Sequence, residues 1–181
     1  MSDLKVFKDD NAGECIEHYT DKNDIAQRMK KVGIRYEQWE TSETIPAGAD
    51  SETVIQAYKK DIYDLMAEEG YKTVDVISLT ADHPQKDELR KKFLDEHIHS
   101  EDEVRFFVKG QGLFTLHIGN EVFEILCTQG DLIGVPDGTR HWFDMGPNPE
   151  FTAIRLFNNP EGWVANYTGN AIAMQYSRLE N

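Results

Sequence analysis

The chain has 181 residues, of which 39% are hydrophobic and 29% charged, a composition typical of one globular domain with a full core. Its 33 acidic and 19 basic residues give a net charge of −14, which would repel phosphate backbones and anionic lipids, so we expect neither nucleic acid nor a membrane as a partner. The first residues show no signal-peptide pattern, and Cys15 and Cys127 belong to no CxxC pair, so we expect a cytoplasmic protein.

The first part of the chain alternates short strands with a helix. Residues 4–7 predict a strand, and Asp21 or Asn23 can cap a helix that ends at Gly33. Residues 34–39 alternate roughly between apolar and polar side chains, which indicates a half-buried strand.

A longer helix is expected next, capped by Ser51 and ended by Gly70. Its apolar side chains recur at helical spacing and predict one buried stripe, at Val54, Tyr58, Ile62, Leu65 and Met66. Residues 74–79 predict another strand. Pro84 then opens a short helix that finishes at Lys91–Lys92, where cations suit the helix dipole.

From Phe93 onward the pattern changes to short strands separated by tight turns. The Gly119–Asn120 pair is a two-residue hairpin signal. Strands are predicted at residues 104–108, 113–118, 122–126, 131–135, 141–145 and 151–157. Such closely spaced strands favour an antiparallel sandwich or barrel.

The predicted fold is therefore mainly β with an α+β N-terminal part: an antiparallel β-barrel (jelly roll) with flanking helices. We expect a single domain over residues 1–181. Within it, residues 1–92 would form a helix-containing layer packed as an appendage on the outside of the barrel, residues 93–160 the barrel strands, and residues 161–181 a tail.

Four candidate metal ligands lie in one stretch: His97, His99, Glu103 and His141. Side chains alternate faces along a strand at ~3.3 Å per residue, so His97 and His99 would share a face ~6–7 Å apart. Glu103 opens the next strand, and His141 must arrive on a different strand folded alongside. A lone strand histidine is more often a core or surface residue, but three imidazoles and a carboxylate together favour a site for iron, nickel, zinc, manganese or cobalt.

Glycines and a proline separate these ligands. Gly110 and Gly112 flank one residue between two strand-like runs, as in a turn that needs positive φ. The run Pro136–Gly138 predicts a tight turn that delivers His141 to the next strand. This two-part motif resembles that of the cupin superfamily. Lys91 replaces the usual glycine before the first histidine and Met145 the usual asparagine after the last, and neither change affects a ligand.

Strand alternation extends the site to two arginines. Arg105 should share the face of Glu103, and Phe143 that of His141, while Arg155 should share a strand face with Ala153 and Phe157. A buried arginine is costly unless it is paired. Each arginine could pair with one of the many carboxylates, or the two could hold an anionic substrate beside the metal.

The remaining polar side chains near the motif are assigned to the surface. His18, His83 and His117 are expected to face solvent. A solvated acidic rim is expected around the metal motif, from Asp95, Glu96, Glu101 and Asp102.

Longer motifs give a narrower resemblance, to the acireductone dioxygenase family of methionine salvage. It rests on the segments 93–99, 101–108, 141–146, 151–155 and 159–163, supported by 75–79 and 32–39, so it covers nearly the whole chain. The resemblance implies metal ligands at His97, His99, Glu103 and His141, with substrate contacts from Arg105 and Arg155 and from the aromatic residues Phe93, Phe143 and Trp163.

The same resemblance implies the reaction. The family binds one Fe(II) or Ni(II) ion and cleaves an acireductone, 1,2-dihydroxy-3-keto-5-methylthiopentene, with O2. Iron gives formate and 4-methylthio-2-oxobutanoate, whereas nickel gives formate, carbon monoxide and methylthiopropionate. Small-molecule substrate and O2 are thus the expected partners, and we expect a monomer. Two alternatives remain: another metal cupin enzyme, such as a different dioxygenase or an isomerase, or a non-catalytic ligand-binding cupin.

Overall fold

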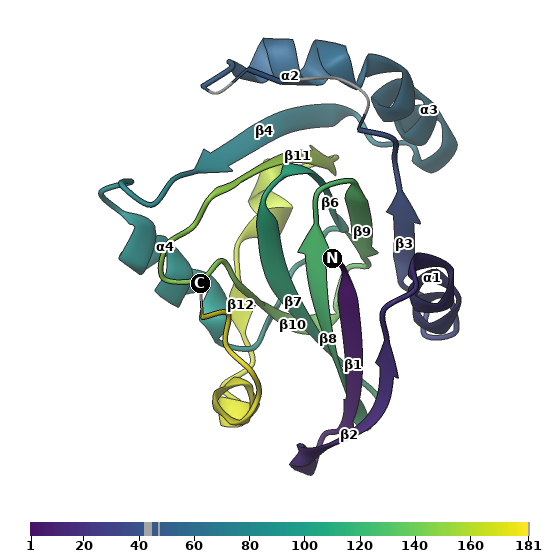
Figure 1. The fold of residues 1–181 in the computed structure, drawn as a ribbon, viewed down its shortest axis with the longest axis vertical. Coiled ribbons are helices and arrows are strands. Elements are labelled where there is room, and N and C mark those ends of the chain that lie inside the picture. Colours follow the sequence, from purple (N-terminus) through teal and green to yellow (C-terminus); the bar gives the residue numbers. More distant parts are fainter. Residues whose placement is uncertain (42–44, 47, 181) are drawn as a thin grey trace.

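A computed structural model describes residues 1–41, 45–46 and 48–180. Its described residues form two antiparallel sheets, which face each other without joining into one closed sheet (Figure 1). The seven-stranded sheet has the order β12 (Asn166–Tyr167), β5 (His97–Ile98), β10 (Arg140–Asp144), β7 (Gln111–Ile118), β8 (Glu121–Thr128), β1 (Asp3–Lys8), β2 (Asn11–Tyr19). The five-stranded sheet has the order β3 (Arg35–Gln38), β9 (Asp131–Val135), β6 (Glu103–Lys109), β11 (Phe151–Phe157), β4 (Thr73–Leu79). The predicted mainly β, antiparallel fold is confirmed.

The main hydrophobic core lies between the two sheets. Strand alternation turns one face of each sheet inward, so the core takes side chains from both, including Leu116, Phe123 and Phe143 from one and Phe107 and Ala153 from the other. All five are almost fully buried. The outer faces are covered separately, which explains why most strands are buried on both sides.

Two helices cover the outer face of the five-stranded sheet, α2 (Ser51–Ala57) and α3 (Lys59–Glu69) (Figure 1). The predicted apolar stripe packs there, and Val54, Tyr58, Ile62 and Leu65 contact outward side chains such as Phe106. The single predicted helix is wrong, because the chain breaks helical geometry at Tyr58, with φ −113° and ψ 18°.

The boundaries of several other elements also differ from the predictions. Asp50, rather than Ser51, caps α2 through Thr53 N. Asp21, one of the two predicted caps, caps α1 (Lys22–Lys30), which ends before the predicted Gly33. Pro84 precedes the short helix, which is α4 (Lys86–Leu94) and ends beyond the two lysines.

The first half of the chain is built into the sheets and is not an appendage. The β1–β2 hairpin extends one sheet at its edge, and β3 and β4 form both edges of the other. Strand β2 was not predicted, because its side chains are mostly exposed and show no apolar alternation. Among the described residues, none of the helices is both long and apolar enough to cross a membrane.

Gly110 marks a crossing between the sheets. It joins β6 to β7, which lie in different sheets, and its φ of +77° fits the predicted need for glycine. A Cβ there would lie 1.9 Å from the carbonyl oxygen of Glu150. Gly112 serves a different purpose from the one predicted, since it lies inside β7 and a Cβ would fall 2.4 Å from the Phe143 ring.

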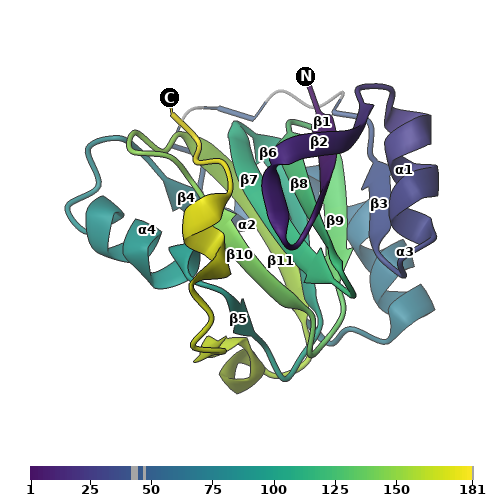
Figure 2. The ribbon, with the colours of Figure 1, turned by 90° about the horizontal axis from the view of Figure 1, so that it is seen from below.

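The C-terminal segment crosses the outer face of the seven-stranded sheet (Figure 2). Asp144, at the end of β10, accepts hydrogen bonds from Arg90 Nε at 2.8 Å and from the backbone N–H of Leu179 at 2.9 Å. Burial acts to raise the pKa of Asp144, but these hydrogen bonds and one from Gly146 outweigh it and leave the pKa below its ordinary value. This carboxylate therefore ties α4, β10 and the chain end together.

Candidate active site

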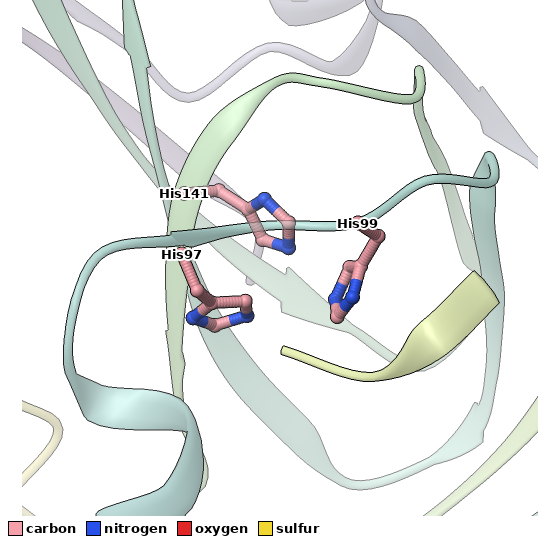
Figure 3. Close-up of side chains that lie close together, drawn as sticks. All are labelled: His97, His99 and His141. Carbon is pink, nitrogen blue, oxygen red and sulfur yellow. The ribbon is translucent and has the colours of Figure 1, made fainter. Parts of the chain in front are cut away.

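The side chains of three histidines, His97, His99 and His141, converge (Figure 3). His97 and His141 are direct cross-strand partners on β5 and β10, and His99 follows His97 on the same face. The ring centroids lie 4.6 Å apart for His97 and His141 and 5.0 Å apart for the other two pairs. One ring nitrogen of each lies within 4.8 Å of the others, a spacing that lets all three reach one ion.

Backbone carbonyl groups orient all three rings. Each Nδ1 lies near a carbonyl oxygen: that of Asp95 for His97 (2.7 Å), of Thr139 for His141 (2.7 Å) and of Val164 for His99 (3.3 Å). An Nδ1–H that donates to a carbonyl leaves the Nε2 lone pair free, which is the tautomer that a metal requires. The turn predicted at residues 136–138 contributes as well, because the Gly138 N–H donates to the carbonyl oxygen of His99.

Glu103 lies beside the three rings. Its Oε2 is 3.0 Å from His141 Nε2 and 3.4 Å from His99 Nε2, and the residue is only 4% exposed. Burial alone would raise the pKa of Glu103, but the Arg105 guanidinium, together with the adjacent His141 and His99, holds it well below its usual range. The carboxylate is therefore ionised and ready to act as a ligand.

Burial also keeps the His97 imidazole neutral near neutral pH. Loss of hydration on burial is the main effect that lowers the pKa of His97, to about 4. The nearby His141 lowers it further. A neutral imidazole can donate its lone pair to a metal near neutral pH without first losing a proton. Three oriented imidazoles and one ionised carboxylate suit a divalent transition-metal ion with mixed nitrogen and oxygen ligands.

A cavity of about 270 Å³ opens onto this cluster. Its walls include His99 and Glu103 on the metal side and the two predicted arginines, Arg105 and Arg155. Two of the three predicted aromatic residues, Phe93 and Trp163, line the cavity. The third, Phe143, packs against Arg105, with its ring centroid 4.9 Å from the guanidinium carbon.

The two arginines face each other across neighbouring strands, Arg105 on β6 and Arg155 on β11. Each has a carboxylate partner: Arg105 Nε lies 2.8 Å from Glu103 Oε1, and Arg155 makes two hydrogen bonds to Asp75. Burial lowers the pKa of Arg105, and Glu103 counteracts this effect. The sequence left two alternatives for the arginines, pairing with carboxylates or holding an anionic substrate. The carboxylate pairs are present, and both arginines also line the cavity.

Comparisons with known proteins agree with this geometry. The sequence profile of the ARD/ARD′ family matches residues 3–165. The chain belongs to this family. Acireductone dioxygenases of Alcanivorax borkumensis and Stutzerimonas stutzeri are 59% and 57% identical, over 98% and 100% of both chains. A solved structure of acireductone dioxygenase from Bacillus anthracis, with a cadmium ion in its active centre, superposes with a TM-score of 0.82 at 32% identity, covering 92% of this chain and 98% of that one.

Two predictions about the surroundings of this ARD-family site are wrong. His117 is 4% exposed and Glu96 is 1% exposed, so neither faces solvent. His117 Nδ1 lies 2.6 Å from Glu96 Oε2, and its Nε2 lies 3.2 Å from Asp9 Oδ2. Thr168 Oγ1 donates to the other Glu96 oxygen at 2.7 Å. This network lies behind β5, on the opposite face from the metal-ligand candidates, and the C-terminal segment covers it.

Asp75 lines the cavity and pairs with Arg155, and sequence reasoning missed it. It lies on β4 directly opposite Arg155 and lines the cavity. The available signal was a single carboxylate within the apolar run 74–79, where a charged side chain needs a partner. His18, by contrast, is exposed, as predicted.

Proposed function

We propose that His97, His99, Glu103 and His141 hold one Fe(II) or Ni(II) ion and that the chain uses it to cleave an acireductone with O2. The observation that carries this proposal is the convergence of three oriented imidazoles and an ionised carboxylate at the end of a cavity with two arginines. The general activity is that of an acireductone dioxygenase, since relatives 53–59% identical over nearly their full length bear that name.

The expected substrate is 1,2-dihydroxy-3-keto-5-methylthiopentene. With iron the products would be formate and 4-methylthio-2-oxobutanoate; with nickel they would be formate, carbon monoxide and methylthiopropionate. The reaction belongs to methionine salvage. When bound, the ion would supply Lewis-acid chemistry and a template for two neighbouring oxygens of the substrate.

The side chains of this chain divide the remaining work. Arg105 and Arg155 offer N–H donors to the negative charge of the enediolate and of the carboxylate products. Phe93 and Trp163 supply an apolar wall for the methylthio end, and Phe143 supports the guanidinium group of Arg105 from below. The indole N–H of Trp163 donates to the carbonyl oxygen of Asp102, which fixes the ring at the cavity wall.

We also propose that the protein works in the cytoplasm. Both cysteines are free thiols, Cys127 fully buried and Cys15 exposed, as suits a reducing compartment. The monomeric state stays a prediction, which light scattering of the metal-loaded protein would check.

Product analysis tests the proposal. One metal-free preparation is split, reloaded with Fe(II) or Ni(II), verified for a single metal, and supplied with acireductone and O2. We expect the keto acid from the iron half and carbon monoxide from the nickel half, because both ions would occupy the same ligands and differ only in their own reactivity. Identical products would contradict the metal-directed reaction. A metal-loaded protein that consumes no O2 would favour the isomerase or the non-catalytic cupin.

A further inference from the structure

A row of charges crosses the five-stranded sheet beside the metal-ligand candidates. In register, Asp75 on β4 lies opposite Arg155 on β11, and Arg155 lies opposite Arg105 on β6. Arg105 in turn contacts Glu103, two residues earlier on the same strand and on the same face. The order of charges is therefore negative, positive, positive, negative, with the two arginines in the middle and both of them on the cavity wall.

Asp75 holds Arg155 at two points. Arg155 Nε donates to Asp75 Oδ1 at 2.8 Å, and an Arg155 terminal nitrogen donates to Asp75 Oδ2 at 2.6 Å. A bidentate pair of this kind fixes the plane of the guanidinium as well as its position. The plane is also supported by the Trp163 ring, whose centroid lies 4.6 Å from the guanidinium carbon.

The pairing leaves part of Arg155 free for a ligand. A guanidinium carries five N–H donors, and Asp75 occupies two of them. Arg105 repels Arg155 from the neighbouring strand, because like charges opposite each other are unfavourable. Without Asp75, the long side chain of Arg155 could swing away from Arg105 toward solvent, since it is 24% exposed.

We propose that Asp75 is a positioning residue for the reaction. It fixes Arg155 next to Arg105, so that the free donors of both guanidinium groups meet one anionic substrate. This inference rests on the proposed function of the site. Asp75 itself need not touch the substrate, because its two carboxylate oxygens are engaged with Arg155.

A purely electrostatic role for Asp75 predicts the opposite result. If Asp75 only neutralised Arg155, its removal would strengthen the attraction of the cavity for anions, and KM would fall. If Asp75 only stabilised the fold, the melting temperature would fall while the KM of the folded fraction stayed constant. Positioning predicts that KM rises and kcat/KM falls by about tenfold, because a misplaced donor no longer meets the reacting charge.

The test uses Asp75→Asn, which keeps the shape of the side chain and removes its charge. Steady-state O2 consumption with acireductone gives kcat and KM, while metal content and melting temperature are measured in parallel. We expect a higher KM, about tenfold lower kcat/KM, and unchanged metal content, since Asp75 contacts none of the ligand candidates in the described structure. The matched control is Asp64→Asn, which removes an exposed aspartate paired with Lys60 on α3 and should leave all four measurements unchanged.

A double-mutant cycle decides whether Asp75 acts through Arg155. In an Arg155→Ala background, Asp75→Asn should cause no further loss of kcat/KM. A second tenfold loss in that background, or a lower KM for Asp75→Asn alone, would overturn the proposal. Failure of the proposed function would look different, because the wild-type protein would then consume no O2 with acireductone.

Discussion

The pair between Arg105 and Glu103 predicts a link between metal binding and stability. Both residues are 4% exposed, and Arg105 Nε lies 2.8 Å from Glu103 Oε1. In the metal-free protein, Arg105→Met would leave a buried carboxylate without its main cationic neighbour, and removing one partner of such a pair costs about 3 kcal/mol or more. A bound divalent cation would compensate the same carboxylate, so we expect about half that loss in the metal-loaded protein.

This difference fixes the expected change in metal affinity. A mutation that destabilises the free form more than the loaded form must tighten metal binding to the folded chain, here by about tenfold for about 1.4 kcal/mol. Turnover should nevertheless fall by about a hundredfold or more, because an N–H donor beside the substrate charge is lost. Urea unfolding with and without Ni(II), metal competition with a chelator, and O2 consumption measure the three quantities.

Arg28→Met is the matched control. Arg28 also pairs with carboxylates, with Nε 2.6 Å from Glu17, and also lies over an aromatic ring, 5.0 Å from Phe123, but it is remote from the cavity. Its loss of stability should be the same with and without metal, and its activity normal. If Arg105→Met instead lost its metal, Arg105 would serve to hold Glu103 as a ligand, which would contradict the expected tightening of metal binding.

Three further predictions concern the scaffold. Glu96→Ala should lower the free energy of unfolding by about 1.5–3 kcal/mol in urea titrations, because His117 would lose a buried hydrogen-bonding carboxylate at 2.6 Å; the double variant with His117→Ala should lose less than the sum, and additive losses would contradict the pairing. The folded pKa of Asp144 lies below 3.8, so this carboxylate contributes stability that is complete above pH 3.8 and is lost as pH falls through the folded pKa; the gap between wild type and Asp144→Asn should shrink over that acid range, and a constant gap would refute it. Gly110→Ala should destabilise far more than Gly33→Ala in thermal melts, since both have positive φ but only Gly110 has backbone 1.9 Å from the added Cβ; equal losses would show that the contact relaxes freely.

The strands and the metal-ligand candidates could be predicted because they depend on short-range patterns. Alternation within 103–109 put Glu103 and Arg105 on one face, and the turn at 136–138 led correctly into the strand of His141. The cross-strand meeting of His97 and His141 then follows from the fold. Local side-chain order and turn chemistry are therefore enough to assemble most of this site.

The errors share one feature, which is that the local sequence does not signal them. His117 and Glu96 look like surface residues locally, and they are buried because the N-terminal turn and the C-terminal segment close over them. The break at Tyr58 has the same character, because nothing in its neighbours along the chain interrupts the apolar stripe. Strand β2 has exposed side chains and is specified by its pairing with β1 rather than by its own pattern.

The carboxylate partner of Arg155 also could not be identified from the local sequence. The sequence indicated that a buried arginine needs a carboxylate, but the chain has 33 acidic residues, and only the sheet register selects Asp75. The pairing of Arg105 with Glu103 was easier to predict, since these residues are two apart on one strand.

Oxygen uptake on addition of acireductone is a direct test of the metal centre assigned to this chain. The wild-type chain is stripped of metal, reloaded with one Fe(II) per chain, and compared with the metal-free form and with His141→Ala treated in the same way. We expect the reloaded wild type to consume O2 in proportion to substrate, and the other two samples to show almost no enzyme-dependent uptake, because His141 is one of three converging imidazoles. Equal uptake by His141→Ala, or none by the reloaded wild type, would contradict the assignment of this site as the metal centre of an acireductone dioxygenase.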